Sequence, residues 1–330
     1  MMFAIDLFAG IGGLGLGFKN AGFEVTGVEI DYKKAKVYAL NVGTAIRADV
    51  RAFAFKRKLA TVIIAGPPCR PYSRATPKFR RGAAHPEYGL DMEVARATAE
   101  AEPEVVVVEE VPGWRPNQLL GALNELGYSA EVRLINFGEF GVPIAKKRWI
   151  LIALKSLNAK DIFKELEKMR EKPLNPEDVL NLPETLGAFP DHRTYNIKSI
   201  VKELVPYIPP GYSLLSAYKA GLLPEQLIRS AVKDVNKKHS YWLYRVPLKG
   251  PVKMVPHPRR SLLLHPLYDR LMSVRELARL MTFPDSFCSA PLNADEAMRA
   301  IGESIPPKFS EKLAKVIRNN INQILGGIVG

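Results

Sequence analysis

The feature that most constrains the fold is a glycine-rich turn near the start of the chain. Residues 3–8 form an apolar run that predicts a buried strand, and Gly10, Gly12 and Gly13 separate this run from a predicted helix. Glycines at this place let the backbone approach a ligand closely, as in nucleotide-binding α/β folds. The next predicted strand, residues 23–29, ends in Glu29, where a carboxylate can accept hydrogen bonds from both hydroxyls of a ribose. Together they predict an α/β fold that binds an adenosine-containing cofactor.

The alternation of predicted strands and helices continues through the first half of the chain. We expect strands at residues 45–50, 61–65, 103–111, 128–136 and 148–154, and helices at residues 31–41, 90–102, 121–126 and about 306–325. The composition is 47% hydrophobic over 330 residues, which is enough for a large core. The predicted fold class is a doubly wound, Rossmann-like α/β domain.

Residues 155–264 differ from this pattern. Prolines recur, periodicity weakens, and Tyr241, Trp242 and Tyr244 lie among lysines and arginines. The composition predicts an inserted smaller domain, and we place the divisions of the chain at 1–160, 161–265 and 266–330. Aromatic residues among positive charges suit contacts with nucleic acid, but they are equally typical of a small core with a basic surface. Near residue 273, Ser273 and Glu276 have the spacing of a helix-capping box.

One of the two cysteines lies in a rigid turn. The predicted strand 61–65 runs into Gly66-Pro67-Pro68-Cys69, and a strand-end loop is where α/β proteins place chemistry. Cys69 is therefore a candidate nucleophile, the alternative being a small buried thiol. Cys288 is interpreted as a packing residue. Two cysteines so far apart in sequence do not suit a disulfide framework or a cysteine-rich zinc site, and we expect no metal.

Two acidic residues end the most apolar predicted strand. Four valines precede Glu109 and Glu110, which predicts a central strand that is buried on both faces. A carboxylate is costly to bury, so at least one of the two is expected to be functional.

The charge of the chain indicates a polyanionic partner. The formal net charge is +13, and no acidic residue occurs between residues 70 and 81. A basic balance can also reflect only a solvated surface, and the stretch after Cys69 can be an ordinary surface loop. The basic residues of this stretch are Arg70, Arg74, Lys78, Arg80 and Arg81.

These motifs, in this order, resemble those of the DNA (cytosine-5) methyltransferase family. The Pro-Pro-Cys-x-x-x-Ser pattern at residues 67–73 is similar to the family's catalytic loop, and residues 6–13 resemble its S-adenosylmethionine motif. The resemblance implies that Phe8 packs on the adenine, Glu29 holds the ribose and Asp49 reads the adenine amino group. The alternative for Asp49 is a helix cap. The cofactor-binding residues implied are Asp6, Phe8, Gly10, Ile11, Gly12, Gly13, Glu29, Ile30, Asp49, Val50 and Ser304.

The resemblance also implies a catalytic set and a mobile loop. Cys69 would be the nucleophile after Pro68, Glu109 the catalytic glutamate and Arg148 a base-contacting arginine. The loop after Cys69 would close over the target nucleotide, with nucleic-acid contacts from Ser73, Arg74, Lys78, Arg80 and Arg81.

Four residues depart from the family pattern. Glu110 stands where the family has asparagine, so that a charge is added that could raise the pKa of its neighbour. Ile144 and Lys146 replace the glutamine and the first arginine of a Gln-x-Arg-x-Arg pattern. Glu303 replaces asparagine beside Ser304, and we interpret it either as favouring the cationic cofactor over its neutral product or as a mark of altered activity.

The expected function is methyl transfer from S-adenosylmethionine to C5 of a flipped-out cytosine in duplex DNA. The expected product is a modified recognition sequence, with a paired restriction endonuclease as a candidate partner. Three alternatives remain: a tRNA-directed cytosine-C5 methyltransferase, a catalytically impaired protein that binds DNA or protein, and a nucleotide-binding oxidoreductase. We expect the protein to lie in a reducing cytoplasm, because the chain shows no signal peptide and no membrane-spanning apolar run. We also expect it to be a monomer that associates with the nucleoid through DNA.

Overall fold

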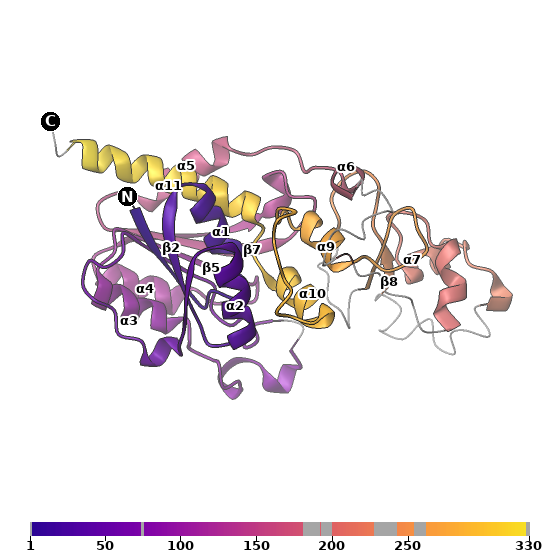
Figure 1. Ribbon diagram of the computed structural model, residues 1–330, viewed down its shortest axis with the longest axis horizontal. Helices are drawn as coiled ribbons and strands as arrows, with labels where there is room; N and C mark the ends of the chain where they lie inside the picture. The colour runs from indigo at the N-terminus through magenta and orange to yellow at the C-terminus, as the bar shows by residue number, and fades with distance from the viewer. Residues whose placement is uncertain are drawn as a thin grey trace. The chain divides into compact units, whose positions relative to one another are not determined.

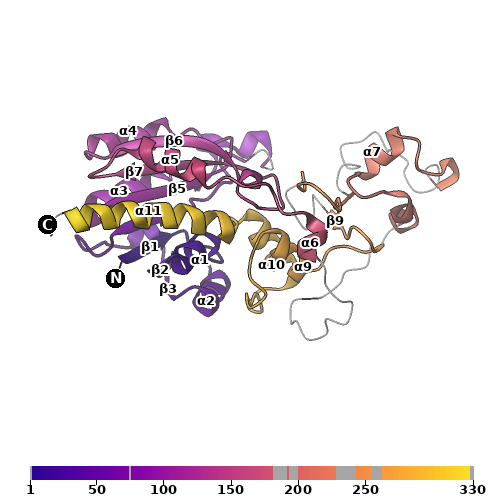
Figure 2. The ribbon, with the colours of Figure 1, turned by 90° about the horizontal axis from the view of Figure 1, so that it is seen from above.

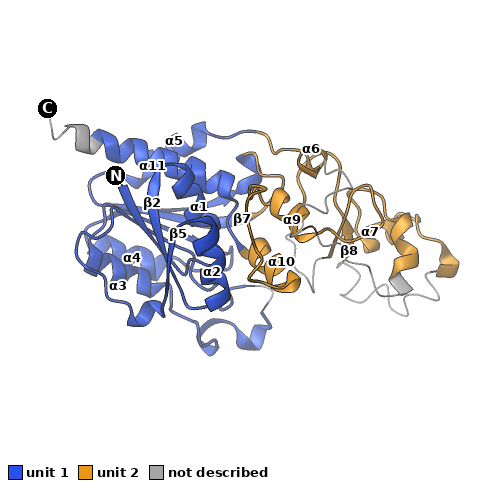
Figure 3. Ribbon diagram, in the orientation of Figure 1, with its two compact units in different colours: residues 1–140, 147–171, 304–330 blue, residues 141–146, 172–303 orange. Residues whose placement is uncertain are grey.

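The chain forms two compact units, each assembled from segments that are distant in sequence (Figure 3). The computed structural model describes residues 2–73, 76–180, 192, 200–227, 243–253 and 262–327. Unit 1 comprises residues 1–140, 147–171 and 304–330, and unit 2 comprises residues 141–146 and 172–303. The divisions predicted from the sequence at residues 160 and 265 concern function rather than compactness, and they stay a prediction.

Unit 1 is organised around a seven-stranded sheet (Figure 1). The strand order is β3-β2-β1-β4-β5-β7-β6, in which β7 is antiparallel to both of its neighbours and the other pairs are parallel. The strands are β1 (Met2–Leu7), β2 (Phe23–Glu29), β3 (Thr44–Arg47), β4 (Val62–Ala65), β5 (Val105–Glu110), β6 (Ser129–Asn136) and β7 (Lys147–Leu154).

Helices cover both faces of this sheet. They are α1 (Gly13–Asn20), α2 (Tyr32–Asn41), α3 (Met92–Ala101), α4 (Asn117–Glu125), α5 (Ala159–Lys168) and α11 (Pro307–Gly327), with short 3-10 helices η1 (Val50–Ala52), η2 (Lys78–Arg80), η3 (Gly82–Ala84) and η4 (Phe137–Glu139). On one face, α3 and α4 bury Val94 and Leu119 against strand residues such as Leu7, Ile63 and Val106. This arrangement confirms the predicted doubly wound α/β class.

The last helix returns to the first one. Helix α11 runs beside α1 (Figure 2), where Ser310 Oγ donates a hydrogen bond of 2.9 Å to the carbonyl oxygen of Gly13. A Cβ atom on Gly17 would lie 1.9 Å from Ser310 Oγ, so only glycine permits this approach. The C-terminal helix α11 therefore contacts the glycine-rich turn at Gly13, where α1 begins.

Most predicted elements occur within a few residues of their predicted bounds. Strand β3, expected over residues 45–50, begins at Thr44 and ends at Arg47. It ends there because the Asp49 side chain accepts the Arg51 amide at 3.0 Å and begins η1. Helix α4 begins at Asn117, four residues before the expected start.

Unit 2 contains little regular sheet. Its strands β8 (Leu243–Arg245) and β9 (Leu262–Leu264) form one parallel pair, and its helices are α6 (Pro176–Leu180), α7 (Leu214–Lys219), α9 (Val274–Leu280), α10 (Ala294–Glu303) and the 3-10 helix η5 (Ile200–Tyr207). Leu204, Ile208, Leu243 and Leu264 form its small core.

Two predictions for this part of the chain can be compared with the structure. Ser273 caps α9 and Glu276 completes the expected capping box. Tyr244 is buried, which favours the small-core interpretation at that residue, whereas Tyr241 and Trp242 lie outside the described residues. None of the described helices is long and apolar enough to cross a membrane.

Candidate active site

The sheet brings the Cys69 turn and Glu109 to the same edge. Strands β4 and β5 are parallel neighbours in which Ala65 lies opposite Val108, so the chain leaves both strands at one level. A Cβ atom on Gly66 would lie 3.8 Å from Oε2 of Glu109. Cys69 is a half-buried thiol whose carbonyl oxygen accepts hydrogen bonds from the amides of Tyr72 (3.0 Å) and Ser73 (2.9 Å). The two predicted catalytic residues thus belong to adjoining strand ends.

An ion pair joins Glu109 to Arg148. Strand β7 runs antiparallel beside β5, and the Nε atom of Arg148 lies 2.8 Å from Oε1 of Glu109. The two side chains are 13% and 12% exposed, so the pair is largely shielded yet reachable from solvent. An opposite charge at this distance keeps a carboxylate and a guanidinium fixed relative to each other. The structure therefore brings the side chains of Glu109 and Arg148 together, and their roles toward a base stay a prediction.

The second acidic residue of β5 is enclosed. Glu110 is 1% exposed, its Oε2 accepts the Val111 amide at 2.5 Å, and its Oε1 has no hydrogen-bond partner among the described residues. Burial raises the pKa of Glu110 well above its usual value, and the charge of Glu109 raises this pKa further. The neighbouring charge of Glu109 therefore adds to the rise in the pKa of Glu110, which is the more buried of the two residues.

Asp91 is a structural residue of this site that the sequence did not reveal. Its Oδ1 accepts a hydrogen bond from the Tyr72 hydroxyl (3.2 Å), and its Oδ2 accepts one from the Trp114 indole (2.9 Å). Asp91 thereby ties the Cys69 turn to the segment after β5 and is itself buried. In the sequence it is only an acidic residue near a predicted helix start, since the pairing depends on which strands are neighbours.

The glycine-rich turn is held by Glu29. The Glu29 carboxylate accepts hydrogen bonds from the amide of Gly10 (2.7 Å) and the amide of Asp31 (2.8 Å). Each oxygen keeps a second lone pair that can accept a ribose hydroxyl. Phe8, which precedes the turn, has a left-handed φ of 55°, an uncommon backbone conformation for a non-glycine residue.

The C-terminal segment closes the other side of this turn. A Cβ atom on Gly13 would lie 2.1 Å from Ser304 Oγ and 2.3 Å from the carbonyl oxygen of Ile305. Gly12 has a φ of +89° at the start of α1, which also favours glycine. The turn, the Glu29 carboxylate and Ser304 therefore form a backbone-lined cradle that fits an adenosine-containing cofactor.

The remaining predicted cofactor residues differ in their surroundings. Asp6 is buried beneath α1 beside Tyr38, since a Cβ on Gly15 would lie 2.7 Å from Asp6 Oδ2 and 2.5 Å from the Tyr38 hydroxyl. Burial raises the pKa of both groups. Asp49 caps η1 and pairs with Arg51, as the capping alternative expects. Ile11 and Val50 are buried, whereas Ile30 is exposed.

The basic stretch after Cys69 is largely solvent-facing. Lys78 and Arg80 are exposed, and Arg81 is half-buried with its Nε donating to the carbonyl oxygen of Thr76 at 2.6 Å. Ser73 follows directly in the Cys69 turn, and Arg74 lies outside the described residues. Their contacts with nucleic acid stay a prediction.

Three of the four departures from the family pattern, Ile144, Lys146 and Glu303, lie in unit 2. Ile144 is buried and forms a bridge with Val252. Lys146 is fully buried, and its Nζ donates to the carbonyl oxygens of Gly302 and Glu303, each at 3.0 Å. The Glu303 side chain itself is exposed.

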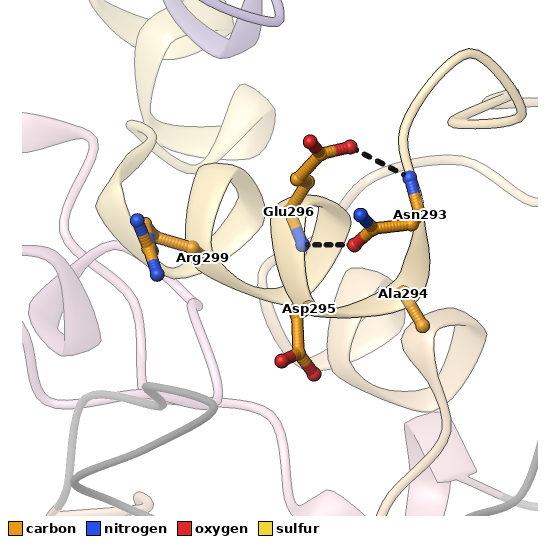
Figure 4. A pocket seen from close by; sticks show the side chains of 5 residues that line it. All are labelled: Asn293, Ala294, Asp295, Glu296 and Arg299. Atoms are coloured by element: carbon orange, nitrogen blue, oxygen red, sulfur yellow. Dashed lines mark hydrogen bonds between the residues drawn. The ribbon is translucent and has the colours of Figure 1, made fainter.

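A surface pocket at the start of α10 contains none of the predicted site residues (Figure 4). Its principal feature is reciprocal capping, in which the Asn293 amide donates to Glu296 (2.9 Å) and the Glu296 amide donates to Asn293 (3.0 Å). Within the described part of the chain, no group of three or more histidine, cysteine or acidic side chains is arranged to hold a metal ion.

Comparisons with known proteins agree with this geometry. The family model for C-5 cytosine-specific DNA methylase matches residues 2–319. A Methanocaldococcus jannaschii protein named as a type II methyltransferase, M.MJ0563P, is 27% identical over 97% of this chain and 100% of its own length. Type II methyltransferase M.MthTI of Methanothermobacter thermautotrophicus is 25% identical over 97% of this chain and 98% of its own length.

A solved structure shows the same fold. It is described as a DNA modification methyltransferase encoded within an Escherichia coli prophage, with a TM-score of 0.68 and 23% identity over 98% of this chain and 100% of that one. With the match over residues 2–319, this chain belongs to the C-5 cytosine-specific DNA methylase family, and its enzyme class is DNA cytosine-5 methyltransferase.

Proposed function

We propose that this enzyme methylates C5 of a cytosine flipped out of duplex DNA, through a covalent bond between Cys69 and C6 of the base. The observation that carries the proposal is the Arg148–Glu109 ion pair at the strand end beside the Cys69 turn. The pair offers a carboxylate and a guanidinium that can hold the edge of a pyrimidine, at the strand end that adjoins the turn carrying Cys69.

Cysteine addition solves the chemical problem of a poor nucleophile. C5 of cytosine reacts slowly with electrophiles, so the Cys69 thiolate first adds to C6 and the electron pair of the C5–C6 double bond moves toward the N3 side. Glu109 accepts a hydrogen bond from the exocyclic amine and shares a proton with N3, which takes up the negative charge that the shift brings there, and Arg148 binds O2. After C5 has gained a methyl group, loss of the C5 proton and elimination of Cys69 restore the double bond and free the thiolate.

The methyl donor is S-adenosylmethionine, whose sulfonium supplies an electrophilic methyl group. The residues that would hold it are Glu29 at the ribose, the backbone of Gly10, Gly12 and Gly13, and Ser304. Pro68 stiffens the turn before Cys69, so the thiol keeps one position relative to Glu109.

Duplex DNA is the proposed substrate, within a restriction–modification system. The relatives named above are called type II methyltransferases, which supports a sequence-specific modification role. Exposed Lys78 and Arg80 in the stretch after Cys69 suit phosphate contacts. A duplex hides C5 inside the base stack, and base flipping is therefore part of the proposal.

Covalent trapping tests the nucleophile and the substrate together. Duplex DNA that contains the recognition sequence and 5-fluorocytosine is incubated with the enzyme and S-adenosylmethionine, because fluorine at C5 cannot leave as a proton and the adduct persists. Methylation of genomic DNA in an expression host, read by sequencing, first identifies that sequence. We expect a denaturant-stable adduct with wild type and with Cys288→Ser, but none with Cys69→Ser.

The outcomes separate the alternatives. An adduct that survives in Cys69→Ser would refute the assignment of the nucleophile. An adduct formed only with 5-fluorocytosine tRNA in a parallel reaction would move the substrate to RNA. Cofactor binding without any adduct or methylation would indicate an impaired enzyme.

A further inference from the structure

Lys146 is fully buried and bonded to the end of a helix. Its side chain is 0% exposed, and its ammonium donates to two successive backbone carbonyl oxygens, Gly302 and Glu303, at 3.0 Å each. These carbonyls belong to the last turn of α10, where the helix leaves such groups unsatisfied. A lysine at a helix C-terminus also interacts favourably with the negative end of the helix dipole.

Burial of an ammonium is expensive unless its bonds are made. Removing a charged group from water is strongly unfavourable, and charge-assisted hydrogen bonds must offset that cost. Lys146 makes these bonds, and it stands where the family pattern has arginine. One of its two acceptors is the carbonyl oxygen of Glu303, which also departs from the pattern. Two unusual positions are therefore joined by one interaction.

The two ends of this interaction lead to different parts of the proposed site. Glu303 is followed directly by Ser304, whose Oγ lies at the place that a Gly13 Cβ would occupy. Lys146 is followed two residues later by Arg148, which pairs with Glu109. The Glu303 side chain is exposed, and the hydrogen bond of 3.0 Å from Lys146 goes to the backbone carbonyl oxygen of this residue.

We propose that Lys146 is a positioning residue that fixes the Gly302–Ser304 turn, so that Ser304 meets the glycine-rich turn in the arrangement that binds S-adenosylmethionine. This inference rests on the proposed function for the identity of the cofactor. On this inference Lys146 affects the binding of the cofactor, although its side chain touches neither cofactor nor base.

Three substitutions grade the interaction. Lys146→Arg keeps a charge and several donors, Lys146→Gln keeps a neutral donor, and Lys146→Met keeps only the apolar length of the side chain. Lys315→Met is the matched control, because Lys315 lies on α11 and makes an exposed ion pair with Glu311. Calorimetry measures the dissociation constant for S-adenosylmethionine, steady-state kinetics measures KM and kcat, and thermal unfolding is recorded for each variant.

We expect the dissociation constant and KM for S-adenosylmethionine to rise at least about tenfold in Lys146→Met, as for lost charge-assisted hydrogen bonds. Lys146→Gln should lie between Met and Arg, and Lys146→Arg should restore most of the affinity. Lys315→Met should bind the cofactor as wild type does. If Lys146→Met does not fold, the Gln and Arg variants alone carry the comparison.

A lower melting temperature with an unchanged dissociation constant in Lys146→Met or Lys146→Gln would overturn the inference, because Lys146 would then be purely structural. Failure of the proposed function gives a different result, namely that wild-type protein does not bind S-adenosylmethionine at all.

Discussion

The two units bury different kinds of ionisable side chain. Leaving histidine and tyrosine aside, the buried ionisable side chains in the described part of unit 1 are carboxyl groups: Asp6, Glu29, Asp91 and Glu110. In unit 2 most are cationic, namely Lys146, Arg245 and Arg275, with Glu276 as the acidic member. The difference follows from how each unit satisfies its backbone and from what it must bind.

Unit 1 satisfies its backbone within the sheet and uses acidic groups near strand ends. Its strands pair along their length, so few carbonyl oxygens need a side-chain donor. Glu29 instead accepts hydrogen bonds from backbone amides at the glycine-rich turn, and Asp91 accepts hydrogen bonds from the side chains of Tyr72 and Trp114. Carboxylates accept hydrogen bonds, which is what turns that expose amide groups require.

Unit 2 uses side-chain donors in place of a sheet. Arg245 donates to the carbonyl oxygens of Ile208 (2.6 Å), His265 (2.9 Å), Tyr268 (3.0 Å) and Val205 (2.8 Å), and it pairs with Asp269 at 2.5 Å. A guanidinium carries five N–H groups, so one arginine holds together several segments of irregular backbone. Basic residues of this region are thus not all available for DNA.

The largest expected effect sharpens the functional side of this contrast. Glu109→Gln should lower kcat about 10²- to 10⁴-fold, because the amide has no acidic proton to share with N3 as negative charge develops there. Single-turnover methylation measures the rate, and circular dichroism should show an unchanged fold. A rate within threefold of wild type would remove Glu109 from the proposed mechanism.

Unit 2 should respond to loss of Arg245 through stability. Arg245→Met leaves several buried carbonyl oxygens without their donor, and we expect a loss of about 3–5 kcal/mol in the free energy of unfolding. Urea denaturation measures it. Arg57→Met, at an exposed pair with Glu102, is the control and should cost less than about 1 kcal/mol. Equal losses in both variants would contradict the structural role assigned to Arg245.

Acid should weaken unit 2 through His265. Burial lowers the pKa of His265 to about 4, and its Nδ1 accepts the amides of Leu267 and Tyr268 in the neutral form. Glu276 opposes this shift, whereas Arg270 and Arg245 add to it. Since the unfolded chain takes up the proton near pH 6.5, stability should fall by up to about 3 kcal/mol between pH 6.5 and pH 4.

A His265→Gln variant tests this assignment. It removes the titration and should reduce the difference in unfolding free energy between pH 6.5 and pH 4. A pH dependence identical to that of wild type would assign the acid sensitivity to other groups.

Rising pH should weaken unit 1 through Glu110. A raised pKa means that folding favours the protonated acid, so its contribution is complete below the usual pKa of a glutamate and is lost as pH rises through the pKa of the folded state. Between these two pKa values the linked loss is about 1.4 kcal/mol per pH unit, and above the pKa of the folded state it grows no further. Trp114 and Trp149, both in unit 1, report unfolding by fluorescence in a Trp242→Phe background.

The isosteric Glu110→Gln variant stays neutral at every pH. It should therefore lose less stability than wild type as pH rises above the usual pKa of a glutamate. A pH dependence of stability identical to that of wild type would mean that Glu110 does not titrate differently in the folded and unfolded states.

The smallest effect is expected at Glu303. Its side chain is exposed, so Glu303→Asn should change the affinity for S-adenosylmethionine less than about threefold. Calorimetry with S-adenosylmethionine and with its neutral product S-adenosylhomocysteine measures the preference. A loss of preference for the cationic cofactor would instead support the electrostatic interpretation of Glu303.

The sequence by itself determined the fold class and the chemistry of the strand ends. Apolar runs such as residues 61–65 and 103–111 predict buried strands because a parallel sheet is covered on both faces. The turn residues that follow each run, the glycines at 10–13 and Pro68-Cys69, carry their own conformational requirements. These are local properties, and local properties can be predicted from neighbours in the chain.

Tertiary structure decided which separate residues meet. The order of strands places Glu109 beside the Cys69 turn and Arg148 on the antiparallel strand next to it. Lys146 and Asp91 acquire their roles only from partners that are up to 157 residues away, as Lys146 is from Glu303. Such pairings depend on how the whole chain buries its surface, because no periodicity or local motif encodes them.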